Sequence, residues 1–477
     1  MKNNAEQPTF YFHDYETFGI NPALDRPAQF AGVRTDSNFN IIEEPLVIYC
    51  QQSQDYLPNP EAVLVTGITP QETNLKGLCE AEFTKQIHQA FNKPNTCILG
   101  YNNIRFDDEV TRNLLYRNFY DPYAYSWQNG NSRWDLLDIV RACYALRPEG
   151  INWPINDAGL VSFRLEHLSK ENNITHEHAH DAMSDVYATI AMAKLIKEKQ
   201  PKLFNYFFSL RNKNKVAELI DIVNMTPLVH VSGMLGSYRG NLSLVCPIAW
   251  HPVQNNAVIV CDLTGDIDSI IDLPVEYIRE KLYTKTENLD LDESRIPLKL
   301  IHINKCPIVA PIKTLLSENA KRFDINVEQC LHKQQKLLQH QSILQDKMRE
   351  LFNTNNDYSV DLDVEAQIYN RFLNNQDKSR CETIRTTSPN LLDTLSMTFD
   401  DSRLTTLFFR YKARNYPQTL TEQEQIIWKD YCRDKLNTNK IRDYLLHLEQ
   451  LAEIYNQQPE KLTIIKNLYN YCYYLVG

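Results

Sequence analysis

The sequence predicts an α/β domain, a small β domain and an all-α C-terminal domain, in that order. Three observations predict them. Strand-like segments alternate with helical spacing up to about Gln200, short β-type segments separated by Gly, Asn and Asp follow, and helical spacing dominates from Ser317. A chain of 477 residues is also too long for one hydrophobic core. We therefore assign residues 9–200, 201–352 and 353–477 to the three domains.

The first domain is predicted to begin with strands and then to alternate between strands and helices. Apolar runs bounded by Pro and Asn predict strands, and apolar residues at helical spacing predict helices. We expect strands at Thr9–Phe12, Phe30–Arg34, Ile41–Cys50 and Thr96–Tyr101, and helices at Glu80–Phe91, Asp107–Phe119, Ser132–Leu146 and Ala179–Lys199. This order is typical of a sheet with helices on its faces.

The remainder of the chain is predicted from the same patterns, and it contains no internal repeat. We expect β segments at Leu228–Gly233, Leu242–Pro247, Ala257–Leu263 and Pro297–Ala310, with an acidic surface loop at Thr284–Arg295. We expect helices at Ala320–Phe352, Glu365–Leu373, Thr421–Asn437, Ile441–Asn456 and Pro459–Tyr474, and a linker at Asn353–Asp363.

The composition is that of a globular cytoplasmic protein. Hydrophobic residues make up 43% and charged residues 23% of the chain, and no run approaches the roughly 20 apolar residues that span a bilayer. The N-terminus lacks the pattern of a secretory signal. Eleven scattered cysteines without a C-x-x-C pair argue against a zinc ribbon or a disulfide framework. We expect them to be buried small hydrophobic residues in a reducing compartment.

The net charge of −10 does not by itself suggest a nucleic-acid-binding protein. The positive charges are nevertheless concentrated in places. Several arginines lie between Arg105 and Arg147, and Leu203–Lys215 contains three cations and no acidic residue. A local basic groove on an acidic protein is therefore possible.

Asp14 and Glu16 directly follow an apolar strand and form the first candidate for chemistry. Residues at i and i+2 on a strand point to the same face, so their carboxylates lie close together. Two negative charges at such a short distance repel each other unless a cation lies between them. The pair therefore suggests a Mg²⁺ or Mn²⁺ site. The alternative is a solvated strand edge, which is the commoner meaning of an isolated Asp-x-Glu.

Two further polar stretches contain candidate residues. In the first, Asp107 begins a helix and is either a site residue or a helix cap, and the neighbouring Phe106 is either a base-stacking platform or core. In the second, His180 precedes Asp185 by five residues at a helix entrance, so both can reach one site. Asp181 is predicted to be a cap. His176 and His178 have no cysteine nearby for a zinc site, so we interpret them as part of a polar loop.

The order and spacing of these motifs resemble the DnaQ-like 3′→5′ exonucleases, in the histidine-bearing branch of that superfamily. The flanking residues are similar to bacterial exonuclease I across nearly the whole chain, most weakly in the C-terminal third. The similar stretches are Phe12–Gly19, Leu24–Phe30, Gly100–Thr111, Arg141–Gly150, Ala179–Ala193, Pro227–Gly233 and Leu300–Pro307. The resemblance implies an RNase H-like exonuclease domain with a mixed sheet, an SH3-like β domain and a helical C-terminal domain.

The resemblance also implies an activity: stepwise 3′→5′ degradation of single-stranded DNA to 5′-mononucleotides, in DNA repair and recombination. It implies that four acids hold two Mg²⁺ ions, for which Mn²⁺ can substitute, and that His180 is the general base. The four acids are Asp14, Glu16, Asp107 and Asp185, and Glu16 also contacts the substrate.

Further residues match positions of that family that contact DNA or a partner protein. The DNA-binding positions are Arg112, Tyr123, Trp127, Arg141 and Arg164, whose alternatives are surface salt bridges for the arginines and core packing for Trp127. The partner is the C-terminal tail of single-stranded-DNA-binding protein, and the matching positions are Arg147 and Tyr206. The surroundings of that pocket carry little positive charge at Met225–Pro227 and Leu315–Leu316. We expect a cytoplasmic monomer.

Two other functions remain open at this stage. An RNA 3′ exonuclease of the same superfamily has the same site residues, although the two additional domains favour the DNA enzyme. A catalytically silent scaffold that binds single strands is less consistent with a complete set of four acids and a histidine.

Overall fold

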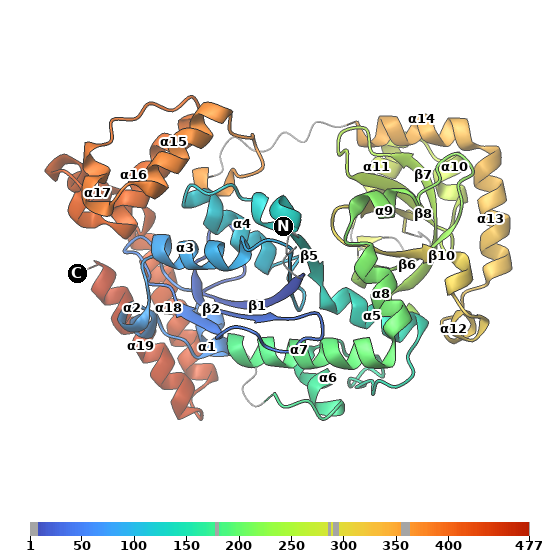
Figure 1. Cartoon of the computed structure of the whole chain (residues 1–477), viewed down its shortest axis with the longest axis horizontal. Coiled ribbons are helices and arrows are strands. Elements are labelled where there is room, and N and C mark those ends of the chain that lie inside the picture. The colour runs from blue at the N-terminus through green and yellow to red at the C-terminus, as the bar shows by residue number, and fades with distance from the viewer. Residues whose placement is uncertain (1–7, 177–180, 285–287, 290–294, 354–362, 477) are drawn as a thin grey trace, which may run out of the picture. The chain divides into compact units, whose positions relative to one another are not determined.

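The computed structural model describes residues 8–176, 181–284, 288–289, 295–353 and 363–476 (Figure 1). The chain forms two compact units. The first comprises Met1–Ser132, His176–Tyr187 and Tyr358–Gly477, and the second comprises Arg133–Thr175 and Ala188–Asp357. Within the described ranges, no helix is both long and apolar enough to cross a membrane.

The sheet of the first unit is mixed, as the resemblance implies. Its central strand β1 pairs antiparallel with β2 and parallel with β4. The strand order is β3-β2-β1-β4-β5, with β1 at Thr9–Thr17, β2 at Pro27–Thr35, β3 at Leu46–Tyr49, β4 at Thr96–Gly100 and β5 at Ser132–Asp135, where the chain leaves the unit.

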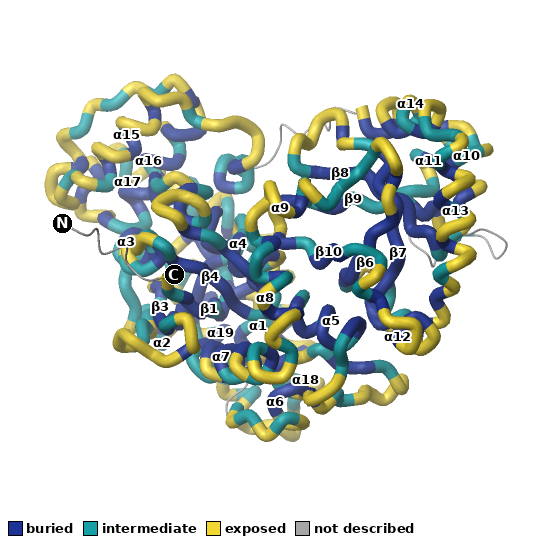
Figure 2. Tube along the Cα trace, turned by 45° about the vertical axis from the view of Figure 1, so that its right-hand side comes forward, coloured by how far each residue is buried: buried dark blue, intermediate teal, exposed yellow. Residues whose placement is uncertain are grey.

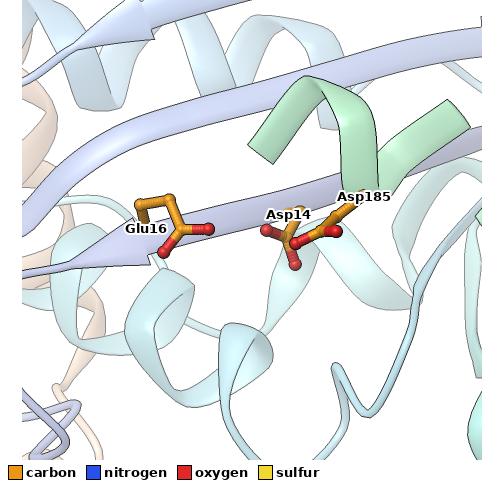
Figure 3. Close-up of side chains that lie close together, drawn as sticks. All are labelled: Asp14, Glu16 and Asp185. Carbon is orange, nitrogen blue, oxygen red and sulfur yellow. The ribbon is translucent and has the colours of Figure 1, made fainter. Parts of the chain in front are cut away.

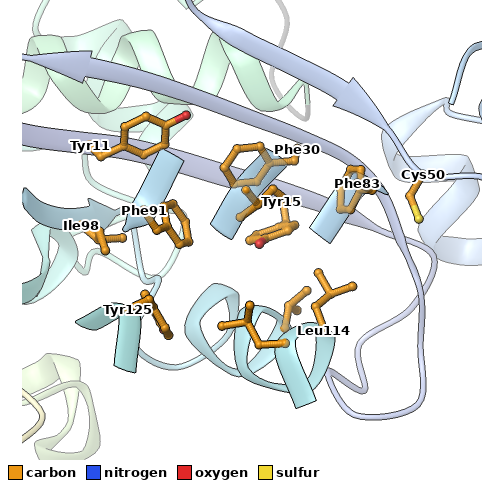
Figure 4. Packing of buried hydrophobic residues seen from close by; sticks show 12 residues of the cluster. Tyr11, Tyr15, Phe30, Cys50, Phe83, Phe91, Ile98, Leu114 and Tyr125 are labelled. Atoms are coloured by element: carbon orange, nitrogen blue, oxygen red, sulfur yellow. The ribbon is translucent and has the colours of Figure 1, made fainter. Parts of the chain in front are cut away.

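Helices lie on both faces of this sheet. Helices α3 (Glu80–Phe91) and α4 (Asp107–Arg117) cover one face, and α7 (Ala182–Lys199) begins on the opposite side (Figure 1). An aromatic core fills the space beneath α3 and α4, where Tyr15 of β1 packs edge-on against Phe30 of β2 (Figure 4). Because successive strand residues point to opposite faces, a buried Tyr15 directs the side chains on either side of it towards α7.

The C-terminal helices belong to the first unit and pack against its N-terminal part. Helices α18 (Thr438–Ile454) and α19 (Pro459–Val476) share an apolar cluster with α1 (Pro60–Thr66). The other helices of this unit are α2 at Pro70–Lys76, α15 at Asn375–Thr386, α16 at Ser402–Asn415 and α17 at Glu422–Lys435. Residues from opposite ends of the sequence therefore share one core.

Buried ion pairs reinforce this junction. The Glu365 carboxylate lies 2.7 Å from the Arg26 guanidinium, 2.7 Å from that of Arg414 and 3.0 Å from that of Arg410. Burial by itself raises the pKa of Glu365, but the guanidiniums of Arg26 and Arg414 outweigh burial and hold the pKa well below its usual value. The junction therefore depends on charges that are fully paired inside the protein.

The second unit contains a five-stranded antiparallel sheet, and Figure 2 shows its strands largely buried. Its order is β10-β6-β7-β8-β9, with β6 at Leu228–Val231, β7 at Leu242–Trp250, β8 at Ala257–Asp262, β9 at Leu298–His302 and β10 at Ile308–Pro311. Its helices are α5 at Leu136–Leu146, α6 at Leu165–Glu171, α8 at Pro201–Ser209, α9 at Lys213–Ala217, α10 at Asp268–Asp272, α11 at Val275–Leu282, α12 at Ser317–Arg322, α13 at Val327–Gln339 and α14 at Gln341–Phe352.

Several predicted elements have different extents. The helix predicted over Ser132–Leu146 begins as strand β5, because Asp135 is extended and caps α5 by accepting a hydrogen bond from the Leu137 N–H (3.0 Å). The strand predicted over Ile41–Cys50 covers only Leu46–Tyr49. The segment Pro297–Ala310 forms two strands, with a left-handed Cys306 (φ 48°) between them.

The helical predictions also need correction. Ala320–Phe352 is three helices, because Asp324 is left-handed (φ 54°) and Asn326 caps a new helix. The helix predicted at Glu365–Leu373 is wrong: only a short 3-10 turn forms there, at Val364–Ala366. The linker Asn353–Asp363 and the loop Thr284–Arg295 lie mostly outside the described residues.

None of the eleven cysteines, all of them described, forms a disulfide, and all but Cys79 and Cys432 are buried. This confirms their interpretation as small apolar side chains.

Candidate active site

Asp14 and Glu16 lie on one face of β1, which confirms the prediction from their spacing. In the ladder with β2 they stand opposite Ala31 and Gln29. Asp14 is partly exposed and Glu16 is buried. The strand therefore presents two carboxylates to the side on which α7 begins.

The Asp107 side chain is directed to β1, and Asp107 is not the N-cap residue of its helix. The N-cap of α4 is Phe106, which makes no side-chain capping bond, and Asp107 is the first helical residue. The Asp107 carboxylate accepts a hydrogen bond from the Tyr15 backbone N–H (3.1 Å). Of the two interpretations left open by the sequence, the geometry favours the site residue.

Asp181 caps α7, as predicted. Its carboxylate accepts a hydrogen bond from the Ser184 backbone N–H (3.0 Å). Gln29, opposite Glu16 on the sheet, accepts a hydrogen bond from the Ala182 backbone N–H (3.3 Å). The helix therefore starts at a fixed point beside β1, and Asp185 lies one turn further on. Gln29 was not identified as a site residue from the sequence, because a glutamine within a strand carries no chemical signal.

Asp14, Glu16 and Asp185 converge on one place. They can offer oxygen atoms that all lie within 4.8 Å of one another, and Figure 3 shows the Asp14 and Asp185 carboxylates side by side with Glu16 further along the strand. Burial, then the charges of Asp107 and Glu16, raise the pKa of Asp14 well above its usual value. Burial, then Asp185 and Asp107, raise the pKa of Glu16 to about 9. Mutual repulsion of this kind is relieved by a divalent cation, so the residues fit a metal site.

The sequence predicts His180 as a site residue and His176 and His178 as part of a polar loop. His180, the predicted general base, and His178 lie outside the described residues. His176 is described, and its side chain is only 4% exposed, with Nε2 2.5 Å from Asp185 Oδ1. His176 lies in an irregular segment, in agreement with its interpretation as part of a polar loop, but the sequence did not predict its contact with Asp185. The sequence carries no signal that marks His176 as a partner of Asp185, because that contact depends on the fold.

Three of the predicted DNA-binding residues lie in the first unit. The Trp127 side chain is 62% exposed, which excludes core packing for it. Arg112 pairs with Glu109 (2.7 Å), and its guanidinium lies 5.5 Å from the Tyr123 ring centroid. Arg112 and Tyr123 therefore form one cation–aromatic pair.

The remaining predicted contacts belong to the second unit. Arg141 pairs with Asp138 (2.8 Å), whereas the Arg164 side chain is 74% exposed and lies 3.9 Å from Glu166. Arg147 donates to the Thr314 carbonyl (3.1 Å) and the Tyr206 hydroxyl donates to the Val309 carbonyl (3.4 Å). Both residues of the predicted partner pocket are thus anchored to backbone near β10.

Comparison with known proteins then identifies the family. Residues 11–193 match the family model described as Exonuclease, 211–354 match the Exonuclease I SH3-like domain, and 362–475 match the Exonuclease I C-terminal domain. Exodeoxyribonuclease I of Haemophilus influenzae is 55% identical over 98% of this chain and 99% of its own length. This chain belongs to the exonuclease I family.

Solved structures of the exonuclease I family agree over the full length. Escherichia coli exonuclease I in complex with a dA16 oligonucleotide has a TM-score of 0.97 and 53% sequence identity, covering 98% of this chain and all of that one. A zinc-ion-bound form of the E. coli exonuclease I–ssDNA complex has a TM-score of 0.96 and 52% identity, covering 99% of this chain. The resemblance and the predicted fold class are confirmed. The exonuclease domain and the acidic cluster together indicate dependence on a divalent metal.

Proposed function

We propose that this protein removes nucleotides one at a time from the 3′ end of single-stranded DNA and releases 5′-mononucleotides. The observation that carries the proposal is the convergence of Asp14, Glu16 and Asp185 beside Asp107. Hydrolysis of a phosphodiester requires neutralisation of charge more than covalent catalysis, and clustered carboxylates that bind cations provide it. The close relatives named exodeoxyribonuclease I support DNA as the substrate.

The metal is proposed to be Mg²⁺, with two ions held by Asp14, Glu16, Asp107 and Asp185. Carboxylate oxygens are the ligands that Mg²⁺ and Mn²⁺ prefer. When bound, the cations supply positive charge to the scissile phosphate and make the attacking water more acidic. The raised pKa values of Asp14 and Glu16 mean that these acids release protons when a cation binds.

His180 is proposed to take the proton from the attacking water. An imidazole that is neutral near pH 7 can accept a proton at that step and return it to solvent afterwards. In the sequence it lies five residues before Asp185 and two residues before the first residue of α7. Glu16 is proposed to contact the terminal nucleotide as well as the metal.

The DNA strand is proposed to contact Arg112, Tyr123, Trp127, Arg141 and Arg164. Guanidiniums neutralise phosphates, and exposed rings stack on bases without regard to sequence. The exposed Trp127 and Arg164 side chains are available for such contacts, whereas Arg112 and Arg141 are already paired with acids and would have to exchange partners.

A protein partner is also proposed: the C-terminal tail of single-stranded-DNA-binding protein, at Arg147 and Tyr206. One solved relative is an ExoI/SSB-Ct complex (TM-score 0.93, 53% identity), which supports the assignment. We propose that the protein acts in the cytoplasm, in DNA repair and recombination. The absence of a disulfide among its eleven cysteines, all of which lie within the described residues, is consistent with a reducing compartment.

Timed digestion of a 5′-labelled single strand, with Mg²⁺ and then with EDTA, tests this proposal. We expect a ladder that shortens from the 3′ end, stops at a duplex region and is absent in EDTA. Asp185→Ala should release no nucleotides yet still bind the strand. Faster digestion of a matched RNA strand would favour the RNA exonuclease, and equal activity of Asp185→Ala and wild type would refute the site.

A further inference from the structure

His176 contacts one member of the acidic cluster, Asp185. Its Nε2 lies 2.5 Å from Oδ1 of Asp185, and its side chain is 4% exposed against 19% for Asp185. A carboxylate accepts hydrogen bonds, so this ring nitrogen carries the N–H and donates to Asp185. A carboxylate has two oxygens with several lone pairs, so a carboxylate that accepts this hydrogen bond can still bind a cation.

The position of Asp185 needs such a support. Its carboxylate offers an oxygen within 4.8 Å of oxygens of Asp14 and Glu16, and like charges at that separation repel. Without a cation, repulsion favours side-chain rotamers that turn Asp185 away from β1. A buried hydrogen-bond donor to the carboxylate opposes that rotation. Residues that hold metal ligands in this way typically raise metal affinity by roughly 10–100-fold.

We propose that His176 is a positioning residue that holds Asp185 in its metal-binding orientation before a cation arrives. The inference rests on the proposed function only in taking Asp185 as a metal ligand. His176 contributes through Asp185, so its effect is on metal affinity and not on the chemical step. This role is distinct from that of His180, which acts on the attacking water.

The test measures Mn²⁺ binding by electron paramagnetic resonance, together with hydrolysis as a function of Mn²⁺ concentration. His176→Ala removes the donor, His176→Phe removes it while keeping a ring, and His176→Gln keeps an N–H donor. The matched control is His447→Ala, which breaks a surface histidine–carboxylate pair in the same unit, with Glu61 at 2.7 Å.

We expect His176→Ala and His176→Phe to weaken Mn²⁺ binding by roughly 10–100-fold. Their kcat at saturating Mn²⁺ should stay near the wild-type value, and His176→Gln should retain most of the affinity. His447→Ala should change nothing. If the alanine variant does not fold, the comparison of phenylalanine with glutamine decides. Equal Mn²⁺ affinity in those two variants, or loss of kcat at saturating metal, would overturn the proposal.

The binding measurement also separates this inference from the proposed function. Wild-type protein that binds Mn²⁺ in a His176-dependent manner but degrades no single-stranded DNA would refute the function and leave the positioning role intact. Wild-type protein that degrades single-stranded DNA, with a Mn²⁺ affinity that substitution of residue 176 does not change, would support the function and refute the positioning role.

Discussion

Replacing Asp14 with asparagine should make the metal-free protein more stable and the enzyme inactive. Two ionised carboxylates within 4.8 Å of each other repel by about 3 kcal/mol at an effective dielectric constant near 20. Part of that cost is relieved by protonation, since burial and neighbouring acids raise the pKa values of Asp14 and Glu16. Asparagine keeps the size and removes the charge. We therefore expect a gain of about 1–3 kcal/mol at pH 8 in EDTA.

With metal bound, the wild type should be more stable than Asp14→Asn. A cation present at 100 times its Kd stabilises the wild type by about 2.7 kcal/mol, whereas Asp14→Asn should gain little. Urea unfolding at pH 8, in EDTA and in Mn²⁺, measures both effects. Glu44→Gln, which removes an exposed acid after β2, is the control and should match wild type in both conditions. An Asp14→Asn protein that is less stable than wild type in EDTA would refute the claim that the cluster is electrostatically strained.

Three further predictions concern the base, the pH dependence and the buried ion pairs. His180→Ala should slow hydrolysis by roughly 10²–10⁴-fold at saturating Mg²⁺, measured by single-turnover digestion; an unchanged rate would remove its role as base. Between the usual carboxyl pKa of 4.5 and about 9, folded metal-free protein retains a proton on Glu16 that the unfolded chain has lost. The stability of the metal-free protein therefore falls as pH rises from 4.5 to about 9. Mn²⁺ should raise Tm more at pH 8 than at pH 5.5, and a smaller rise in Tm at pH 8 would contradict this prediction. Glu365→Ala leaves three guanidiniums without their shared carboxylate and should cost about 3–5 kcal/mol of stability with unchanged Mn²⁺ affinity. Wild-type stability of that variant would show that the ion pairs do not hold the C-terminal helices.

Local chemistry accounts for the parts of the fold and site that the sequence predicts well. The helix Glu80–Phe91 has the predicted bounds because its apolar residues repeat at helical spacing beneath polar ones. The convergence of Asp14 and Glu16 follows from strand geometry alone, which needs no tertiary information. Asp181 is a cap because a carboxylate immediately before a helix satisfies its free N–H groups.

Long-range contacts explain what the sequence does not predict. Glu365 was assigned to a helix, but it is buried among Arg26, Arg410 and Arg414, and those partners determine its backbone. The site role of Asp107 depends on a backbone N–H of β1, more than ninety residues earlier in the chain. The hydrogen bond between His176 and Asp185 likewise forms only in the folded chain. The partners of Glu365 and Asp107 lie outside the local window over which periodicity is measured, and the contact of His176 with Asp185, nine residues away, is not given by helical or strand spacing.

The most direct test of this account is a crystal structure with Mn²⁺ and a single-stranded oligonucleotide, in which anomalous scattering locates the metal. We predict Mn²⁺ peaks within bonding distance of carboxylate oxygens of Asp14, Glu16 and Asp185, with Asp107 beside them and the 3′ phosphodiester facing the metal. Mn²⁺ bound elsewhere, with these carboxylates separated or hydrogen-bonded only to one another, would contradict it.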